Sequence, residues 1–364
     1  MSLRQFRCYA ALRLKLDADV VVLHGPNGAG KTNLLEALSF LSPGRGLRRA
    51  RLAEATRHGA GDGWAVAARL TTPYGPLDVG TGVMGDGERR VVRIDGQNAS
   101  GPAALAERLG VQWLTPQMDR LFLEGPGPRR RFLDRLVFGF DPGHARRVSD
   151  YDRALRERAR LLREAIGDAA WLTALEAEAA AQGVAIAAAR RQALARLERA
   201  LCEDDSGFPR PTLALAGTVE AWLERLPAVD AEHRLAETLR QSRGRDREAG
   251  GAAEGPHRSD LEVRHAGNGV AAAQCSTGEQ KALLVAIVLA SARIEAARRG
   301  VAPLLLLDEV PAHLDGRRRA ELYEQVAALG GQSWLTGTDA GLFQPLRGQA
   351  RFLAVREAHV TVEE

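Results

Sequence analysis

The stretch Gly25-Pro-Asn-Gly-Ala-Gly-Lys-Thr32 directly follows the apolar run Val20-Val-Val-Leu23. The pattern G-x-x-x-x-G-K-T is typical of a phosphate-binding loop, in which backbone N–H groups surround phosphate oxygens. We expect the apolar run to be a buried strand and residues 33–41 to form a helix whose N-terminal end faces the anion. The alternative is a glycine turn before an ordinary helix. The residues predicted to contact ATP here are Gly25, Pro26, Asn27, Gly28, Ala29, Gly30, Lys31 and Thr32. Lys31 is expected to reach the terminal phosphates, and the Thr32 hydroxyl to ligate Mg2+.

A second half of such a site lies at the other end of the chain, in Leu304-Leu-Leu-Leu-Asp-Glu309. Four leucines before two acids predict a buried parallel strand that delivers both carboxylates at its carboxyl end. Asp308 is expected to hold Mg2+ together with Thr32, and Glu309 to orient or deprotonate the attacking water. Without the phosphate loop, these acids would indicate only an ordinary strand end. Because the two halves must meet in space, most of the intervening chain is predicted to be an insertion.

A third segment, Ser276-Thr-Gly-Glu-Gln280, opens an apolar run that has the length of a buried helix. A Ser-x-Gly turn at a helix N-terminus can bind an anion. Since the chain already has a phosphate loop, this turn is explained if it caps the ATP of a second copy, which predicts a homodimer with two shared sites. The residues involved are Ser276, Gly278, Glu279 and Gln280. The alternative is an ordinary N-cap with Glu279 in the first turn.

Length and periodicity predict an α/β protein with two lobes. The 364 residues are 45% hydrophobic, which suffices for a buried core and about two domains. Apolar alternation predicts strands over residues 12–16, 64–70, 77–83 and 89–94, the last three in a small antiparallel sheet. We therefore predict an ATP-binding lobe from residues 1–120 and 251–364, with an inserted, mainly helical lobe over residues 121–250.

The inserted lobe is rich in Ala, Leu, Arg and Glu from about residue 150 to 201. Its periodicity predicts two helices, separated at Gly167-Asp168, that can pack as a hairpin. Residues 241–255 are charged and glycine-rich, and this composition predicts a mobile loop. Strand character returns at residues 260–265.

Charge and cysteine usage bear on the binding partner and on the cellular location of the protein. The formal net charge of +4 and a pI near 9.2 are compatible with a polyanionic partner. Sequence-independent DNA contacts need only clustered cations, although solvated helix faces look the same. Cys8, Cys202 and Cys275 show no zinc or disulfide spacing, and the longest apolar run is shorter than the roughly 18 residues of a membrane span. We therefore expect a cytoplasmic protein. The candidate DNA-contacting clusters are Arg129–131, Arg45 with Arg48, Arg49 and Arg51, and Arg317–319, with His257-Arg258 as a contact, switch or structural element.

The order of the three motifs, followed by Ala312-His-Leu-Asp315, resembles that of the ABC-type ATPases, in the branch that includes the SMC proteins and RecF. Three further segments are similar to the RecF family: Thr32-Asn-Leu-Leu-Glu-Ala37, Gly127-Pro-Arg-Arg-Arg-Phe-Leu-Asp134 and Gly255-Pro-His-Arg-Ser-Asp-Leu261. The resemblance implies a P-loop ABC-type core with an antiparallel β subdomain. It also implies a Q-loop near Gln117, a D-loop acid at Asp315, and a switch residue at Thr336 or Thr338. A polar loop residue is an equally good account of Gln117.

The same resemblance implies a function in DNA repair. A weak, DNA-stimulated ATPase of this kind would dimerise on ATP, bind duplex DNA at gaps or at single-strand–double-strand junctions, and assist RecA loading with RecO and RecR. The main alternative is the ATPase subunit of an ABC transporter, which shares the three motifs. A small-molecule kinase would use the phosphate loop but would leave residues 276–280 unexplained.

Overall fold

The computed structural model describes residues 1–61, 63–72, 74–85, 89–164 and 168–363, and it divides into two compact units. Unit 1 comprises Met1–Asp119, Glu203–Arg210 and Cys275–Glu364, and unit 2 comprises Arg120–Cys202 and Pro211–Gln274. The predicted organisation placed the last boundary at residue 250. The structure places it after Gln274, because the strand that starts at Asp260 pairs within unit 2.

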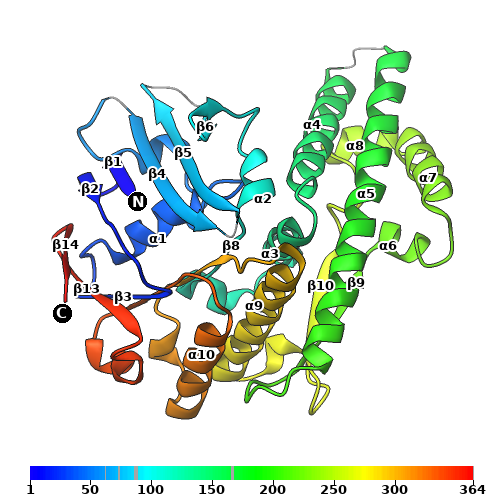
Figure 1. The fold of residues 1–364 in the computed structure, drawn as a ribbon. Helices are drawn as coiled ribbons and strands as arrows, with labels where there is room; N and C mark the ends of the chain where they lie inside the picture. The colour runs from blue at the N-terminus through cyan, green and yellow to red at the C-terminus, as the bar shows by residue number, and fades with distance from the viewer. Residues whose placement is uncertain (62, 73, 86–88, 165–167, 364) are drawn as a thin grey trace. The chain divides into compact units, whose positions relative to one another are not determined.

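Unit 1 is built on a six-stranded sheet of order β14-β13-β3-β12-β11-β8 (Figure 1). Neighbouring strands run parallel except β13 and β14, which are antiparallel. The predicted runs at residues 20–23 and 304–307 are β3 and β11, and all four residues of each run are buried. The strands are β3 (Val20–His24), β8 (Val111–Leu114), β11 (Leu304–Leu307), β12 (Ser333–Gly337), β13 (Ala350–Arg356) and β14 (His359–Val362).

The described part of unit 1 contains four α-helices: α1 (Lys31–Ser39), α2 (Ala104–Arg108), α9 (Thr277–Arg299) and α10 (Gly316–Ala328). The helix predicted over residues 33–41 begins two residues earlier, at Lys31, because the glycine loop ends in the left-handed conformation at Gly30. Helix α9 is buried along residues 280–292, as its apolar sequence predicts.

A second, antiparallel sheet in unit 1 has the order β2-β1-β4-β5-β6-β7. Its inner face packs with α1 in one core, where Phe6, Trp64 and Val66 meet Leu34 and Phe40, and Figure 1 shows α1 behind β4 and β5. The strand predicted at residues 12–16 lies instead at residues 9–13, because its hairpin with β1 sets its start. The strands are β1 (Ser2–Phe6), β2 (Tyr9–Arg13), β4 (Gly63–Thr72), β5 (Gly75–Met84), β6 (Val91–Ile94) and β7 (Gln97–Asn98).

Unit 2 is mainly helical. Helices α4 and α5 carry the predicted hairpin pattern, and residues from both enter one core with α7. Asp168 lies in the connection between them, whereas Gly167 lies outside the described residues. The elements are α3 (Pro126–Phe140), α4 (His144–Arg163), α5 (Ala169–Cys202), β9 (Pro211–Ala216), α6 (Thr218–Trp222), α7 (Ala228–Gln241), α8 (Arg243–Ala249) and β10 (Asp260–His265).

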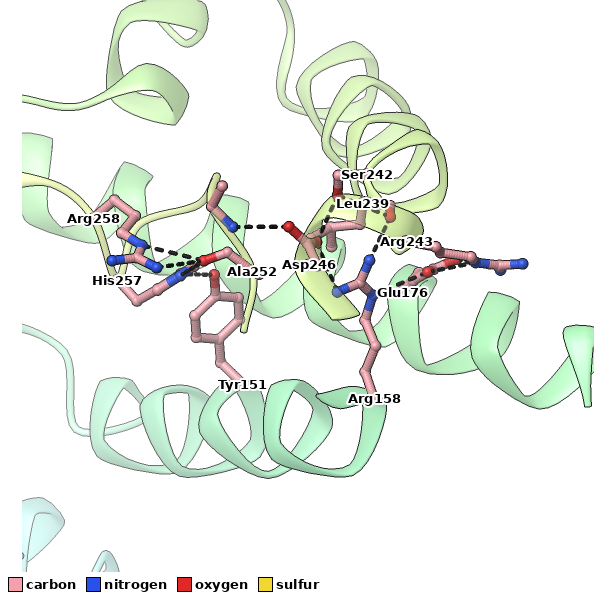
Figure 2. Close-up of polar contacts among 11 residues, drawn as sticks. Tyr151, Arg158, Glu176, Leu239, Ser242, Arg243, Asp246, Ala252, His257 and Arg258 are labelled. Atoms are coloured by element: carbon pink, nitrogen blue, oxygen red, sulfur yellow. Dashed lines mark hydrogen bonds and ion pairs between the residues drawn. The ribbon is translucent and has the colours of Figure 1, made fainter. Parts of the chain in front are cut away.

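The prediction of a mobile loop over residues 241–255 is wrong for residues 243–249. Residues Arg243–Ala249 form α8, which is anchored by the buried Asp246 (Figure 2). The Asp246 carboxylate lies 2.9 Å from the buried Arg158 guanidinium and accepts a hydrogen bond from Ser242. Charged residues therefore order this segment, because their partners, Arg158 on α4 and Glu176 on α5, come from distant parts of the chain.

Within the described residues, no helix is long and apolar enough to cross a membrane. The three cysteines are all free thiols.

Candidate nucleotide site

The phosphate loop connects β3 to α1 through three glycines with positive φ angles, Gly25 (146°), Gly28 (78°) and Gly30 (116°). Two of them also have no room for a side chain. A Cβ at Gly25 would lie 2.1 Å from the Val355 carbonyl oxygen, and one at Gly30 would lie 2.6 Å from the Tyr9 hydroxyl oxygen. The loop shape therefore requires glycine at these positions.

Lys31 is the first residue of α1 and its side chain turns back over the loop. Its ammonium donates hydrogen bonds to the Gly25 and Pro26 carbonyl oxygens at 2.7 and 2.9 Å. Burial lowers the Lys31 pKa, and the negative charges of Glu309 and Asp308 oppose that shift. The predicted phosphate-binding lysine and the predicted acids thus share one electrostatic environment.

The two ends of the chain meet at Asp308. The Thr32 hydroxyl donates to the Asp308 carboxylate at 3.0 Å, and the Asp308 N–H donates to the Leu114 carbonyl oxygen at 2.9 Å. Since β8, β11, β12 and β3 are parallel, their carboxyl ends lie at the same edge of the sheet. Thr32 and Asp308, which the sequence predicts to hold Mg2+ together, are therefore in direct contact.

Thr336, at the end of β12, links both acids. Its hydroxyl donates to Asp308 at 2.7 Å and accepts a hydrogen bond from the Glu309 N–H at 2.9 Å. Thr336 is fully buried, whereas Thr338 is exposed. Of the two switch candidates, only Thr336 thus forms part of this hydrogen-bonded cluster.

Glu309 adopts a left-handed backbone conformation, with φ of 54°. Residues other than glycine rarely occupy this region, and such strain is often found at functional sites. Here the hydrogen bond from the Glu309 N–H to Thr336 helps to hold the turn.

Asp308 is also influenced by a cation, Arg48, that the sequence indicated only as a possible DNA contact. Burial raises the Asp308 pKa, while the hydrogen bonds from Thr336 and Thr32 and the charge of Arg48 oppose that rise. The Arg48 guanidinium lies 3.5 Å from the buried Glu36 carboxylate of α1. Arg48 therefore belongs to the surroundings of the nucleotide site, and the only sequence signal for it was its membership in the Arg45–Arg51 cluster.

The segment at residues 276–280 forms the N-terminus of α9 and a complete capping box. The Ser276 hydroxyl accepts from the Glu279 N–H at 3.3 Å, and the Glu279 carboxylate accepts from the Ser276 N–H at 2.9 Å. The Gly278 carbonyl oxygen accepts from Arg318 at 3.4 Å, and the buried Gln280 donates to the Cys275 carbonyl oxygen. The ordinary N-cap interpretation is thus correct as local structure, and the binding of a second copy's ATP at this turn stays a prediction.

Gln117 and Asp315 lie on short turns of unit 1. Gln117 is exposed in a 3-10 helix, Pro116–Arg120, that follows β8. Asp315 caps α10 by accepting from the Arg318 N–H at 2.9 Å, and this hydrogen bond lowers the Asp315 pKa. The structure does not test the Q-loop role of Gln117 or the D-loop role of Asp315, and both stay predictions.

The candidate DNA-contacting arginines differ in their availability. In unit 2, Arg129 forms a two-pronged ion pair with Asp260 at 2.7 and 2.6 Å, and Arg130 donates to the Ser259 carbonyl oxygen. Only Arg131 of that cluster is exposed. His257 lies 2.7 Å from the Tyr151 hydroxyl oxygen, which favours the structural interpretation of that residue (Figure 2). The sequence could not distinguish these paired side chains from free cations.

Comparison with known proteins agrees with this architecture. The family model described as RecF/RecN/SMC N terminal domain matches residues 1–344. DNA replication and repair protein RecF from Mesorhizobium japonicum is 51% identical over 360 residues, covering 98% of this chain and 95% of that protein. The protein of the same name from Rhizobium meliloti is 50% identical over 366 residues, covering 99% and 97%.

Solved structures show the same fold. A structure of the recombination mediator protein RecF with ATP has a TM-score of 0.84 at 21% identity, covering 100% of this chain and 96% of that one. An Smc head domain from Pyrococcus furiosus has a TM-score of 0.53 at 16% identity, covering 100% and 94%.

The fold and the motif order define an ABC-type ATPase with an antiparallel β subdomain and a mainly helical unit. Within that class, the chain belongs to the RecF family of DNA replication and repair proteins.

Proposed function

We propose that this protein is a weak ATPase of DNA repair that dimerises on ATP and binds duplex DNA at gaps or single-strand–double-strand junctions. The observation that supports this most directly is the cluster in which Thr32 and Thr336 both donate to Asp308 beside Glu309. It gathers a phosphate loop, a metal-binding pair and a candidate base from opposite ends of the chain.

The residues around Asp308 fit Mg2+. A buried carboxylate bonded to a threonine hydroxyl is an oxygen donor set, and Mg2+ commonly takes one or two protein oxygens together with substrate phosphates. Thr32 and Asp308 would hold the ion, which neutralises phosphate charge when bound. Lys31 then binds the terminal phosphates, and Glu309 orients or deprotonates the attacking water.

The proposal that the protein dimerises is supported by the N-terminus of α9, which could contact the ATP of a second copy. Ser276 and Thr277 are exposed at the N-terminus of this 23-residue helix, whose positive end attracts anions. The terminal phosphate of ATP bound to Lys31 of one copy would meet this turn of the other copy. ATP drives closure only if it binds the closed dimer more tightly, and these bridging contacts supply that preference.

The proposed protein partners are based on the similar RecF proteins. Solved RecF proteins are named as recombination mediators of the RecFOR pathway, and the curated relatives are DNA repair proteins rather than transporter subunits. We therefore propose that this chain acts with RecO and RecR to assist RecA loading, and that DNA stimulates its ATP hydrolysis.

Sedimentation velocity with and without ATP and Mg2+, followed by addition of gapped duplex DNA, tests the proposal. Lys31→Ala should abolish ATP-dependent dimers because it removes the phosphate-binding cation. Glu309→Gln should keep long-lived ATP dimers while slowing hydrolysis. Arg351→Ala is the matched control, since Arg351 is an exposed cation on β13 of unit 1. Dimerisation of the Lys31→Ala protein with ATP, or unchanged turnover of Glu309→Gln, would contradict the assigned roles.

A further inference from the structure

The outer face of the antiparallel sheet in unit 1 carries a row of small residues between two arginines. Cross-strand pairing aligns Arg13, Ser2 and Ala67, and continues the row through Gly80 to Arg93. Because Leu3 and Val66 of the alternate row are buried against α1, this row faces away from α1. The face is therefore distinct from the phosphate loop at the start of α1.

Two shallow hollows lie on this face and share Ser2, Arg13 and Ala67. One, of about 580 Å³, extends to Arg4 and Ala65 on β1 and β4. The other, of about 520 Å³, has further lining residues on β4, β5 and β6 and in the segment after β2. Together they form a continuous depression across five strands.

The depression is strongly basic. Among its described lining residues, five are cations and one, Asp78, is a carboxylate; the cations are Arg4, Arg13, Lys15, Arg69 and Arg93. Asp78 neutralises Arg69 through an ion pair at 2.6 Å. Arg93 donates to the neutral Asn98, and no ion pair joins Arg4, Arg13 or Lys15 to a carboxylate within the described residues. Four cations thus have no neutralising partner among the residues that the structure describes.

At the centre of the depression lies Gly80, where the fold leaves room for a larger side chain. Gly80 has an ordinary backbone conformation, and a Cβ there would meet the Ala67 Cβ at 3.9 Å and the Val66 carbonyl oxygen at 4.0 Å, both ordinary contacts. Glycine in a strand interior costs stability and often marks a site where a ligand or another backbone approaches closely. Neither backbone geometry nor packing explains Gly80, whereas a ligand that approaches the sheet does.

The chemistry of the depression favours a phosphate backbone over a protein partner. Protein interfaces depend on large apolar or aromatic anchors at their centre, and here the centre consists of Ser2, Ala65, Ala67 and Gly80. Arg13 and Arg93 lie four strand spacings apart, about 19 Å between backbones. Cations at that separation can reach phosphates on both sides of a DNA groove, because the major groove is about 12 Å wide.

We propose that this surface, called here the basic sheet face and defined by Arg4, Arg13, Lys15, Ala67, Gly80 and Arg93, binds the backbone of duplex DNA. It requires neither nucleotide nor a second copy of the chain. The proposal thus goes beyond ATP-dependent DNA binding, and it adds a contact that holds a single protein on DNA before ATP closes a dimer.

Anisotropy of a fluorescein-labelled random-sequence duplex, without nucleotide and across a salt series, tests the proposal. Arg4→Ala/Arg13→Ala should weaken binding about tenfold or more near 0.1 M salt and flatten the plot of log K against log salt by about two. The matched control is Arg351→Ala/Arg356→Ala, which removes two exposed arginines from β13 of the other sheet. Ala67→Glu should weaken binding without removing any cation, and Ala67→Gln should do so much less.

The outcomes separate this surface from the proposed function. If the Arg4/Arg13 variant behaves as the Arg351/Arg356 control, or if the parent shows no nucleotide-free duplex affinity, the basic sheet face is excluded, while ATP-dependent dimers on DNA would still support the proposed function. Poly-L-glutamate serves as a second probe. Loss of its binding in Arg4→Ala/Arg13→Ala, with duplex binding intact, would assign the face to an acidic protein and overturn the proposal. Thermal unfolding of each variant confirms that these exposed substitutions leave the fold intact.

Discussion

Thr336 is a single hydroxyl on which the geometry of both acids depends. It is fully buried, donates to Asp308, and accepts from the N–H of Glu309, whose backbone has a positive φ. A buried hydroxyl that satisfies two partners stabilises a network more than either bond does alone. Thr336 is thus a positioning residue for the metal-binding acid and for the candidate base.

We expect Thr336→Val to lower ATP turnover by about 10- to 100-fold, the usual cost of removing a residue that orients a metal ligand. Valine keeps the shape but leaves the Glu309 N–H and an Asp308 oxygen without this partner. Steady-state phosphate release at saturating ATP and Mg2+ measures the effect. Thr338→Val is the matched control, because Thr338 is exposed two residues further along the chain. Equal loss in both variants would remove Thr336 from this role.

At the scale of elements, α8 is held to α4 and α5 by buried charge. Arg158 on α4 lies 3.0 Å from Glu176 on α5 and 2.9 Å from Asp246 on α8, and each of the three side chains is at most 2% exposed (Figure 2). Arg243 adds a second cation to Glu176 at 2.6 Å. Removing one member of such a group leaves uncompensated charge in the interior, which is costly.

Arg158→Met should therefore destabilise unit 2 by about 3 to 5 kcal/mol. Arg160→Met, two residues along the same helix, is the control. Arg160 is 40% exposed in its pairs with Glu157 and Glu164, so its loss should destabilise the protein much less. Urea unfolding followed by the helical circular dichroism signal compares the two. Similar midpoints would show that the buried group contributes no more than a surface pair.

At the scale of the molecule, the nucleotide site belongs entirely to unit 1 although its residues come from both ends of the chain. Ligand binding stabilises the states that bind it, so ATP should protect the elements that form the site more than the elements of unit 2. The core of α4, α5 and α7 in unit 2 provides an internal reference.

Hydrogen exchange with ATP and Mg2+ at about 100 times the Kd should slow amides of α1 and β11 by up to about 100-fold, equivalent to about 2.7 kcal/mol. The buried Arg158–Asp246 region should change much less at protein concentrations that keep the chain monomeric. In Lys31→Ala the protection should disappear. Uniform protection of both units would instead indicate that they unfold as one cooperative body.

The sequence alone was sufficient for the ABC-type fold, the β3–loop–α1 unit, and the pairing of Thr32 with Asp308. The fold followed from the resemblance of the motif order to the ABC-type ATPases, whereas the loop unit and the acid depend on local patterns: glycine spacing, an apolar strand, and acids at its end. It also indicated the antiparallel strands, but it misplaced the start of β2 because a hairpin partner sets that start.

Only the tertiary structure distinguished Thr336 from Thr338, ordered residues 243–249 into a helix, and separated paired arginines from exposed ones. These features depend on partners from distant segments, such as Asp308 for Thr336 and Arg158 for Asp246. Local composition carries no information on such partners, because burial and charge pairing are decided when the segments pack.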